Sequence, residues 1–239
     1  MKSVQIIVSV ALLLMVSMGR AQEKNYKNDN FQIKSVEVSH RAELGITVWE
    51  MTVNGEAGNT TPSAAGQLDG APVLGYVFPT SLQSTDVGFG QTEGIVALAL
   101  TSHPDFDDTP LWDENNDRIF NNDGIVWHPH WVVLVQDQRV KGGLSVKQFM
   151  KANESVVLPP TNPGMPMYMD SPGFPVTTMG NKITVVVPDY RMSHQTNFNY
   201  DGVAAFMKVN TSNGQLPMLG VYEVYSVASG DLSLPYKVK

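Results

Sequence analysis

The alternation of apolar and polar residues predicts strands over most of this chain. In residues 44–55 (LGITVWEMTVNG), the side chains of Thr47, Trp49, Met51 and Val53 fall on one face and those of the intervening residues on the other. Successive side chains of a β-strand point to opposite faces, so this period of two predicts a half-buried strand.

Similar segments recur along the chain. Each is short, rich in β-branched or aromatic residues, and closed by Gly, Pro, Asn or Asp, which is typical of strands joined by turns. The predicted strands cover residues 31–39, 44–55, 72–78, 94–102, 125–136, 182–190, 202–210 and 218–228.

Only residues 144–155 (LSVKQFMKANES) suggest a helix, with Ser145 as its N-cap. The fold class is therefore all-β: an antiparallel β-sandwich or a flattened barrel with at most one or two short helices. We expect a single domain over residues 31–236, since no repeat or linker interrupts that span.

Residues 1–21 are predicted to be a secretory signal peptide. Lys2 precedes an apolar run over residues 4–16, and the small residues Gly19 and Ala21 stand before a cleavage point at Gln22. A membrane-spanning helix needs ~20 apolar residues, more than this run contains, so we expect no membrane span. The chain is expected to be exported, to the periplasm or the extracellular space, with residues 22–30 as a disordered lead-in.

Charge and cysteine content narrow the partners. Loss of Lys2 and Arg20 with the signal peptide would change the formal net charge from −7 to −9. Such an acidic protein is repelled by nucleic-acid phosphates and by anionic lipids, so neither is an expected partner. The chain has no cysteine, and its stability must come from a hydrophobic core.

The stretch GIVWHPHWVVLVQD (124–137) carries the strongest candidate site. His128 and His130 share one face of the predicted strand, with Cβ atoms ~6.5–7 Å apart, a spacing that suits two imidazoles on one metal ion. Pro129 between them indicates an edge, a strand start or a bulge. The alternative is that both histidines are structural and bind backbone groups.

His103 is the best candidate for a third ligand, because it follows the predicted strand 94–102. If that strand pairs with 125–136 in a hairpin, His103 should lie across from Trp127 or His128. Three histidines would give an open site of the kind that holds zinc, copper or non-haem iron. The strand register that decides this cannot be derived from the sequence.

The loop over residues 103–124 is strongly acidic. Asp113, Asn115 and Asp117 have the spacing that opens a calcium-binding loop, but Arg118 and Gly124 replace its glycine and its bidentate glutamate. Calcium is therefore a weaker candidate than copper or zinc. The alternative is a solvated loop in which these side chains cap their own backbone.

A second long loop, residues 159–181, contains Met165, Met167 and Met169 at alternate positions. Thioethers are soft ligands that select copper(I), so this loop favours copper if it folds over the histidines. The alternative is that the three methionines fill one end of the fold as adaptable apolar side chains.

Together these features favour an exported, soluble metal-binding protein that holds copper or zinc without catalysis. One alternative is a metal-dependent enzyme with the same histidines, whose general base would come from the acidic loop. The other is a carbohydrate- or partner-binding module with structural histidines. The candidate bases are Asp105, Asp107 and Asp108, and the candidate stacking platform is Trp112, Trp127 and Trp131.

Overall fold

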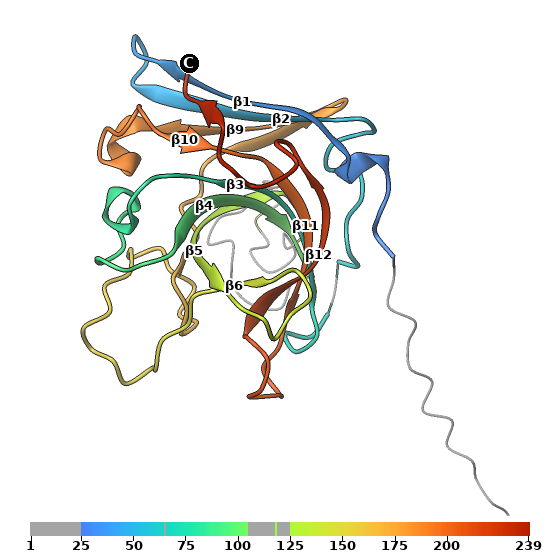
Figure 1. The fold of residues 1–239 in the computed structure, drawn as a ribbon, viewed down its shortest axis with the longest axis vertical. Coiled ribbons are helices and arrows are strands. Elements are labelled where there is room, and N and C mark those ends of the chain that lie inside the picture. Colours follow the sequence, from blue (N-terminus) through green and yellow to red (C-terminus); the bar gives the residue numbers. More distant parts are fainter. Residues whose placement is uncertain (1–24, 65, 105–117, 119–124) are drawn as a thin grey trace, which may run out of the picture.

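A computed structural model describes residues 25–64, 66–104, 118 and 125–239. Regular structure in this part of the chain is almost entirely β, which confirms the predicted fold class (Figure 1). The described residues contain no α-helix and three short 3-10 turns: η1 (Asp29–Phe31), η2 (Ser84–Val87) and η3 (Asp189–Met192).

Six strands form a closed antiparallel barrel, which Figure 1 views along its lumen. The barrel is closed because β4 (Ile95–Ser102) pairs with β5 (His128–Gln136). A short strand, β7 (Met169–Asp170), also pairs with β5. In spatial order the barrel strands are β4 (Ile95–Ser102), β3 (Pro72–Pro79), β11 (Val203–Val209), β12 (Leu219–Val227), β6 (Leu144–Val146) and β5 (His128–Gln136).

A four-stranded antiparallel sheet covers one side of the barrel, as its position above the barrel in Figure 1 shows. Its strands in spatial order are β1 (Ile33–Arg41), β2 (Ile46–Val53), β9 (Lys182–Pro188) and β8 (Val176–Met179). The fold thus combines the two predicted architectures, since a sheet is stacked on a barrel. Strands β10 (Asn199–Tyr200) and β13 (Tyr236–Lys237) form a separate two-stranded sheet.

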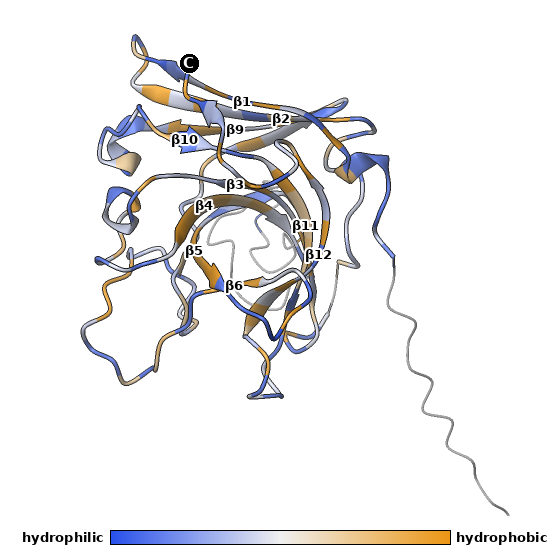
Figure 2. Ribbon diagram, in the orientation of Figure 1, coloured by the Kyte–Doolittle hydropathy of each residue, from blue (hydrophilic) through white to orange (hydrophobic). Residues whose placement is uncertain are grey.

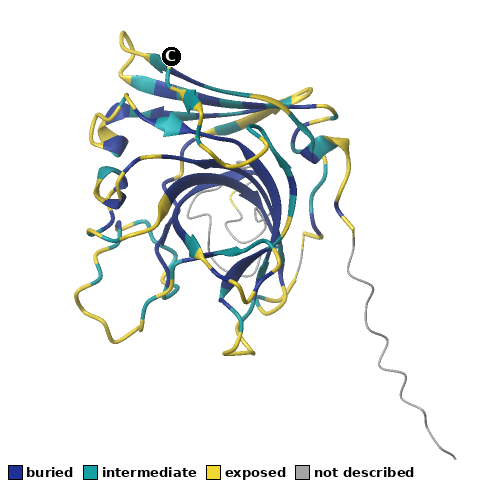
Figure 3. Cartoon of the chain, in the orientation of Figure 1, coloured by how far each residue is buried: buried dark blue, intermediate teal, exposed yellow. Residues whose placement is uncertain are grey.

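Burial explains why the sheet and the barrel differ in sequence pattern. In β2 every second residue is buried: Thr47, Trp49, Met51 and Val53, which the alternation places on one face, are the buried ones. Strands β3, β4 and β5 are buried almost throughout, because one face lines the lumen and the other packs under the sheet. Figures 2 and 3 show this as apolar, buried ribbon around the lumen.

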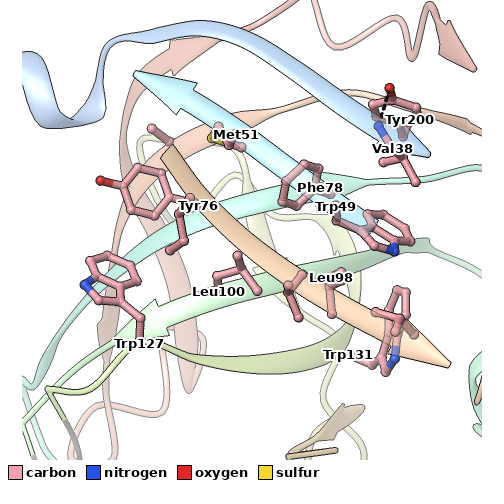
Figure 4. Packing of buried hydrophobic residues seen from close by; sticks show 14 of the residues in the cluster. Val38, Trp49, Met51, Tyr76, Phe78, Leu98, Leu100, Trp127, Trp131 and Tyr200 are labelled. Carbon is pink, nitrogen blue, oxygen red and sulfur yellow. Dashed lines mark hydrogen bonds between the residues drawn. The ribbon is translucent and has the colours of Figure 1, made fainter. Parts of the chain in front are cut away.

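The two faces of barrel strands β3, β4, β5, β11 and β12 belong to two separate cores. The first, called here the outer core, lies between the sheet and the barrel and is rich in aromatic rings (Figure 4). There the Trp49 ring centroid is 5.5 Å from that of Phe78 and 5.8 Å from that of Trp131. The second fills the barrel lumen and consists of aliphatic side chains and methionines, with no aromatic residue among its buried members.

Residues 144–155 do not form the predicted helix. They begin with β6 and continue in turns and a bridge. Ser145 does not cap a helix; it is buried, and its hydroxyl donates a 2.8 Å hydrogen bond to Asp137 Oδ2. Strand pairing with β5 and β12 outweighs the weak local helix preference of this segment.

The predicted signal peptide, residues 1–21, lies outside the described residues. Of the predicted lead-in, residues 25–30 are described and lie against the domain: Tyr26 is buried and its ring stacks on Phe206 at 5.9 Å. None of the helices described in the chain has the length and hydropathy needed to cross a membrane.

Candidate metal centre

Three histidines meet at the end of strand β4 and the start of strand β5. His103, His128 and His130 are all buried, and one ring nitrogen from each lies within 4.8 Å of the others. The sequence-derived set of three histidines is therefore brought together by the fold, and it could hold a metal ion.

Strand β5 presents its side chains as the alternation predicts. Trp127, Trp131 and Val133 belong to the outer core, whereas Val132 and Leu134 line the lumen. Pro129 is the second residue of β5, and the pairing with β4 runs through it without a shift in register. The proline thus marks a strand start and leaves the two histidines on one face.

His103 does not lie directly across from His128, one of the two positions expected for it. Thr101, and not His103, is the residue opposite His128 in the β4–β5 ladder. His103 lies two residues further along the chain, so it is a diagonal neighbour of His128 and not a direct one. A two-residue offset keeps a side chain on the same face of a strand, and diagonal neighbours remain within reach of long side chains.

Each imidazole is oriented through its Nδ1 atom. Nδ1 of His103 lies 2.9 Å from the Pro104 carbonyl oxygen, and Nδ1 of His128 lies 2.6 Å from that of Val126. Nδ1 of His130 is 3.2 Å from the Asp170 carbonyl oxygen and 3.1 Å from the Ser171 hydroxyl. A carbonyl oxygen only accepts, so these Nδ1 atoms donate and the Nε2 atoms keep their lone pairs.

With the protons on Nδ1, the Nε2 atoms of His103 and His128 are two hydrogen-bond acceptors that face each other. The Nε2 atoms of His103 and His128 are 3.0 Å apart. Two neutral Nε2 lone pairs repel at this distance, and a cation between them converts the repulsion into attraction. The hydroxyl of Thr101, 3.4 Å from Nε2 of His128, is a weak alternative donor. Histidines held through one ring nitrogen with the other turned inward are typical of metal ligands.

The environment keeps the imidazoles of His128 and His130 neutral. Burial, reinforced by the neighbouring His103, lowers the pKa of His130 to about 3. Burial, together with His103 and His130, also lowers the pKa of His128 well below 6.5. Neutral imidazole is the form that binds a metal ion, so the site is ready for metal at neutral pH.

The carboxylate of Asp170 faces away from the histidines, although the backbone carbonyl of the same residue contacts His130. Asp170 lies opposite Trp131 of the outer core in the β5–β7 ladder, whereas its neighbour Met169 points into the lumen. Its Oδ1 accepts a 2.6 Å hydrogen bond from Thr161, and burial raises the pKa of its carboxyl group. Within the described residues, the metal-ligating group around the histidines contains no carboxylate.

The three loop methionines line the barrel lumen together with two of the histidines. Met167 and Met169 are buried in the lumen core, and Met165 packs against it, which is what the filling role requires. His103 and His130 line the same cavity, so thioether and imidazole groups share one compartment.

Met207 is a fourth methionine of the lumen that sequence reasoning missed. The signal that could have found it is the alternation in β11, which places Val203, Ala205, Met207 and Val209 on one face. Gly75, opposite Ala205, provides space for it, since a Cβ atom there would lie 2.6 Å from Cε of Met207.

Several other sequence-derived candidates lie outside the described residues. The two tryptophans of the proposed stacking platform that are described, Trp127 and Trp131, are buried in the outer core and cannot offer an exposed surface. The residues outside the described part are the calcium candidates Asp113, Asn115 and Asp117, the candidate bases Asp105, Asp107 and Asp108, and Trp112.

Comparisons with models of protein families, with curated proteins and with solved structures found no match for this chain. The assignment of a function therefore depends on the geometry of the site.

Proposed function

We propose that this protein binds one transition-metal ion, copper or zinc, through Nε2 of His103, His128 and His130, and that it does so without catalysis. One observation carries the proposal. Two buried Nε2 atoms lie 3.0 Å apart while the Nδ1 atom of each ring lies against a backbone carbonyl oxygen. A metal ion satisfies this arrangement, and the donor set is that of an open three-histidine site.

A purely structural role explains the geometry less well. Structural histidines in a core are satisfied by one donor and one acceptor, because a buried polar group without a partner is costly. Here three buried imidazoles each place one ring nitrogen within 4.8 Å of the others, and the Nε2 atoms of His103 and His128 face each other at 3.0 Å. A shared ion removes the repulsion between these two atoms.

The choice between copper and zinc depends on the lumen. Three imidazoles suit zinc and copper equally, whereas thioether groups favour copper(I). Met169 is the methionine best placed to contribute, since Val132, its partner in the β5–β7 ladder, lies two residues from His130 on the same face. If its sulfur binds the ion, Met169→Leu should weaken copper(I) binding at least tenfold and leave zinc affinity unchanged.

Metal titration of untagged protein tests the proposal. Chelator-treated protein should bind one equivalent of zinc or copper, and saturation at a hundred times Kd should raise the free energy of unfolding by about 2.7 kcal/mol. The His128→Ala/His130→Ala variant should lose stoichiometric binding. His194→Asn is the matched control, because it removes an exposed histidine outside the cluster.

Wild-type protein that binds no metal at micromolar concentration would overturn the proposal. So would a double variant that keeps wild-type affinity. Turnover in a hydrolase or oxidase screen with metal restored would replace the non-catalytic role by the enzymatic one.

Export to the periplasm or the extracellular space belongs to the same proposal. It is supported by the charged, apolar and small-residue regions of residues 1–21. Fractionation of the native host with terminal sequencing of the mature protein tests it. The expected first residue is Gln22, and a cytoplasmic chain that retains Met1 would contradict it.

Calcium binding by Asp113, Asn115 and Asp117 remains a weaker prediction. Millimolar calcium added to chelator-treated protein should raise the melting temperature if these residues bind it. An unchanged melting temperature would remove calcium as a stabilising ligand.

A further inference from the structure

The lumen of the barrel contains a cavity of about 90 Å³ beside the histidines. Its lining is apolar except at the position of His103, His130 and Thr101. A cavity lined by aliphatic and thioether groups offers water few hydrogen-bond partners, and such cavities remain dry or bind apolar molecules.

The metal site and this cavity share residues. His103 and His130 both line the lumen, so an ion held by the three histidines would lie at the wall of the cavity and could take a further ligand from it. A fourth ligand that arrives from outside the chain would therefore have its remaining atoms in the cavity.

Charge decides the chemistry of that ligand. Three neutral imidazoles leave a divalent ion with both of its positive charges, in a place where unpaired charge is costly. The described residues of the cluster supply no carboxylate, and Asp170 lies on the opposite face of its strand. An anionic donor would offset this charge, and a carboxylate is already ionised at neutral pH.

We propose that the lumen binds a short-chain monocarboxylate whose carboxylate coordinates the metal ion and whose alkyl chain fills the cavity. This inference rests on the proposed metal site. The size limit follows from the cavity, which is smaller than a ~150 Å³ cavity that holds the six carbons of benzene, so a chain of about two to four carbons fits.

Cobalt(II)-loaded protein provides the test, because ligand exchange at cobalt changes its visible absorption. Titration with straight-chain carboxylates from acetate to octanoate should show affinity rising about three- to fourfold per added methylene up to the optimum. Beyond the optimum, affinity should fall because the chain exceeds the space. Uncharged alcohols of the same length should bind at least tenfold more weakly.

Two substitutions in the lumen should move the optimum in opposite directions. Ala205 and Met207 line the cavity from β11, which is three strands away from β5 around the barrel. Ala205→Leu should shorten the preferred chain, and Met207→Ala should lengthen it. Both variants should keep zinc affinity within about threefold of wild type, and Val203→Leu repeats the test if Ala205→Leu does not fold.

The outcomes separate this inference from the metal proposal. Metal binding without any dependence on chain length, or with the same optimum in all variants, would overturn the carboxylate site alone. Failure of the wild type to bind cobalt or zinc would overturn the metal site and the inference with it.

Discussion

The outer core and the lumen are built by the same barrel strands but differ in what fills them. The outer core contains interlocked rings, such as those of Trp49, Phe78 and Trp131. The lumen contains smaller aliphatic and thioether side chains, three buried histidines at its edge and about 90 Å³ of free space.

This difference separates stability from binding within one fold. Close-packed aromatic rings gain dispersion and hydrophobic energy, and a loss of side-chain volume there destabilises the fold. A lumen with free space gives up part of that energy and can accept a ligand. We expect the outer core to dominate stability and the lumen to dominate binding.

Truncation of an outer-core ring should give the largest effect. Trp49 is fully buried and contacts several rings, so Trp49→Ala should lower the free energy of unfolding by about 3 to 5 kcal/mol. Met207→Ala in the lumen should cost about 2 kcal/mol, the lower end for such truncations, because its surroundings already include a cavity. Urea unfolding measures both, and equal losses would contradict the division between the cores.

Acid should act through the buried histidines His128 and His130 of the metal-free protein. Above pH ~6.5 these imidazoles are neutral in the folded and the unfolded chain. Below that value the unfolded chain takes up protons that the buried rings of His128 and His130 do not accept, since their folded-state pKa values are lowered, to about 3 for His130. The free energy of unfolding should therefore fall as pH drops.

The expected loss is about 1.4 kcal/mol per histidine, or about 2 to 3 kcal/mol in total, between pH ~7.5 and ~5.5. The His128→Gln/His130→Gln variant cannot take up these protons and should lose that part of the slope. An unchanged slope in the variant would show that other groups control the acid sensitivity.

Two adjacent alanines allow a matched test of packing. Ala204 faces the outer core and Ala205 faces the lumen, and both are buried. Ala204→Leu should destabilise the fold by about 1 to 3 kcal/mol because the added atoms meet a filled space. Ala205→Leu should change stability by less than about 1 kcal/mol, since the cavity accepts them. A larger cost at Ala205 in urea unfolding would mean that the lumen is as tightly packed as the outer core.

The smallest effect is expected from the lumen hydroxyl. The Thr101 side chain lies 3.4 Å from Nε2 of His128, a weak contact. Thr101→Val should therefore change stability by less than about 1 kcal/mol and zinc affinity by less than threefold. A tenfold loss of zinc affinity would assign Thr101 a direct role in the metal site.

The amino-acid sequence alone determined the strands and their faces. The alternation in residues 44–55 placed Trp49 and Met51 on one face, and the alternation in residues 125–136 placed His128 and His130 on one face. These features are local, because the direction of a side chain in a strand depends only on its position along that strand.

Tertiary structure decided which segments meet. The register that sets Thr101 opposite His128, and so brings His103 diagonally to the site, depends on pairing between segments in which His103 and His128 are 25 positions apart. Barrel closure and the space beside Met207 depend on strands far apart in sequence. Local pattern cannot encode these distances, since pairing energy is gained only when distant segments come into contact.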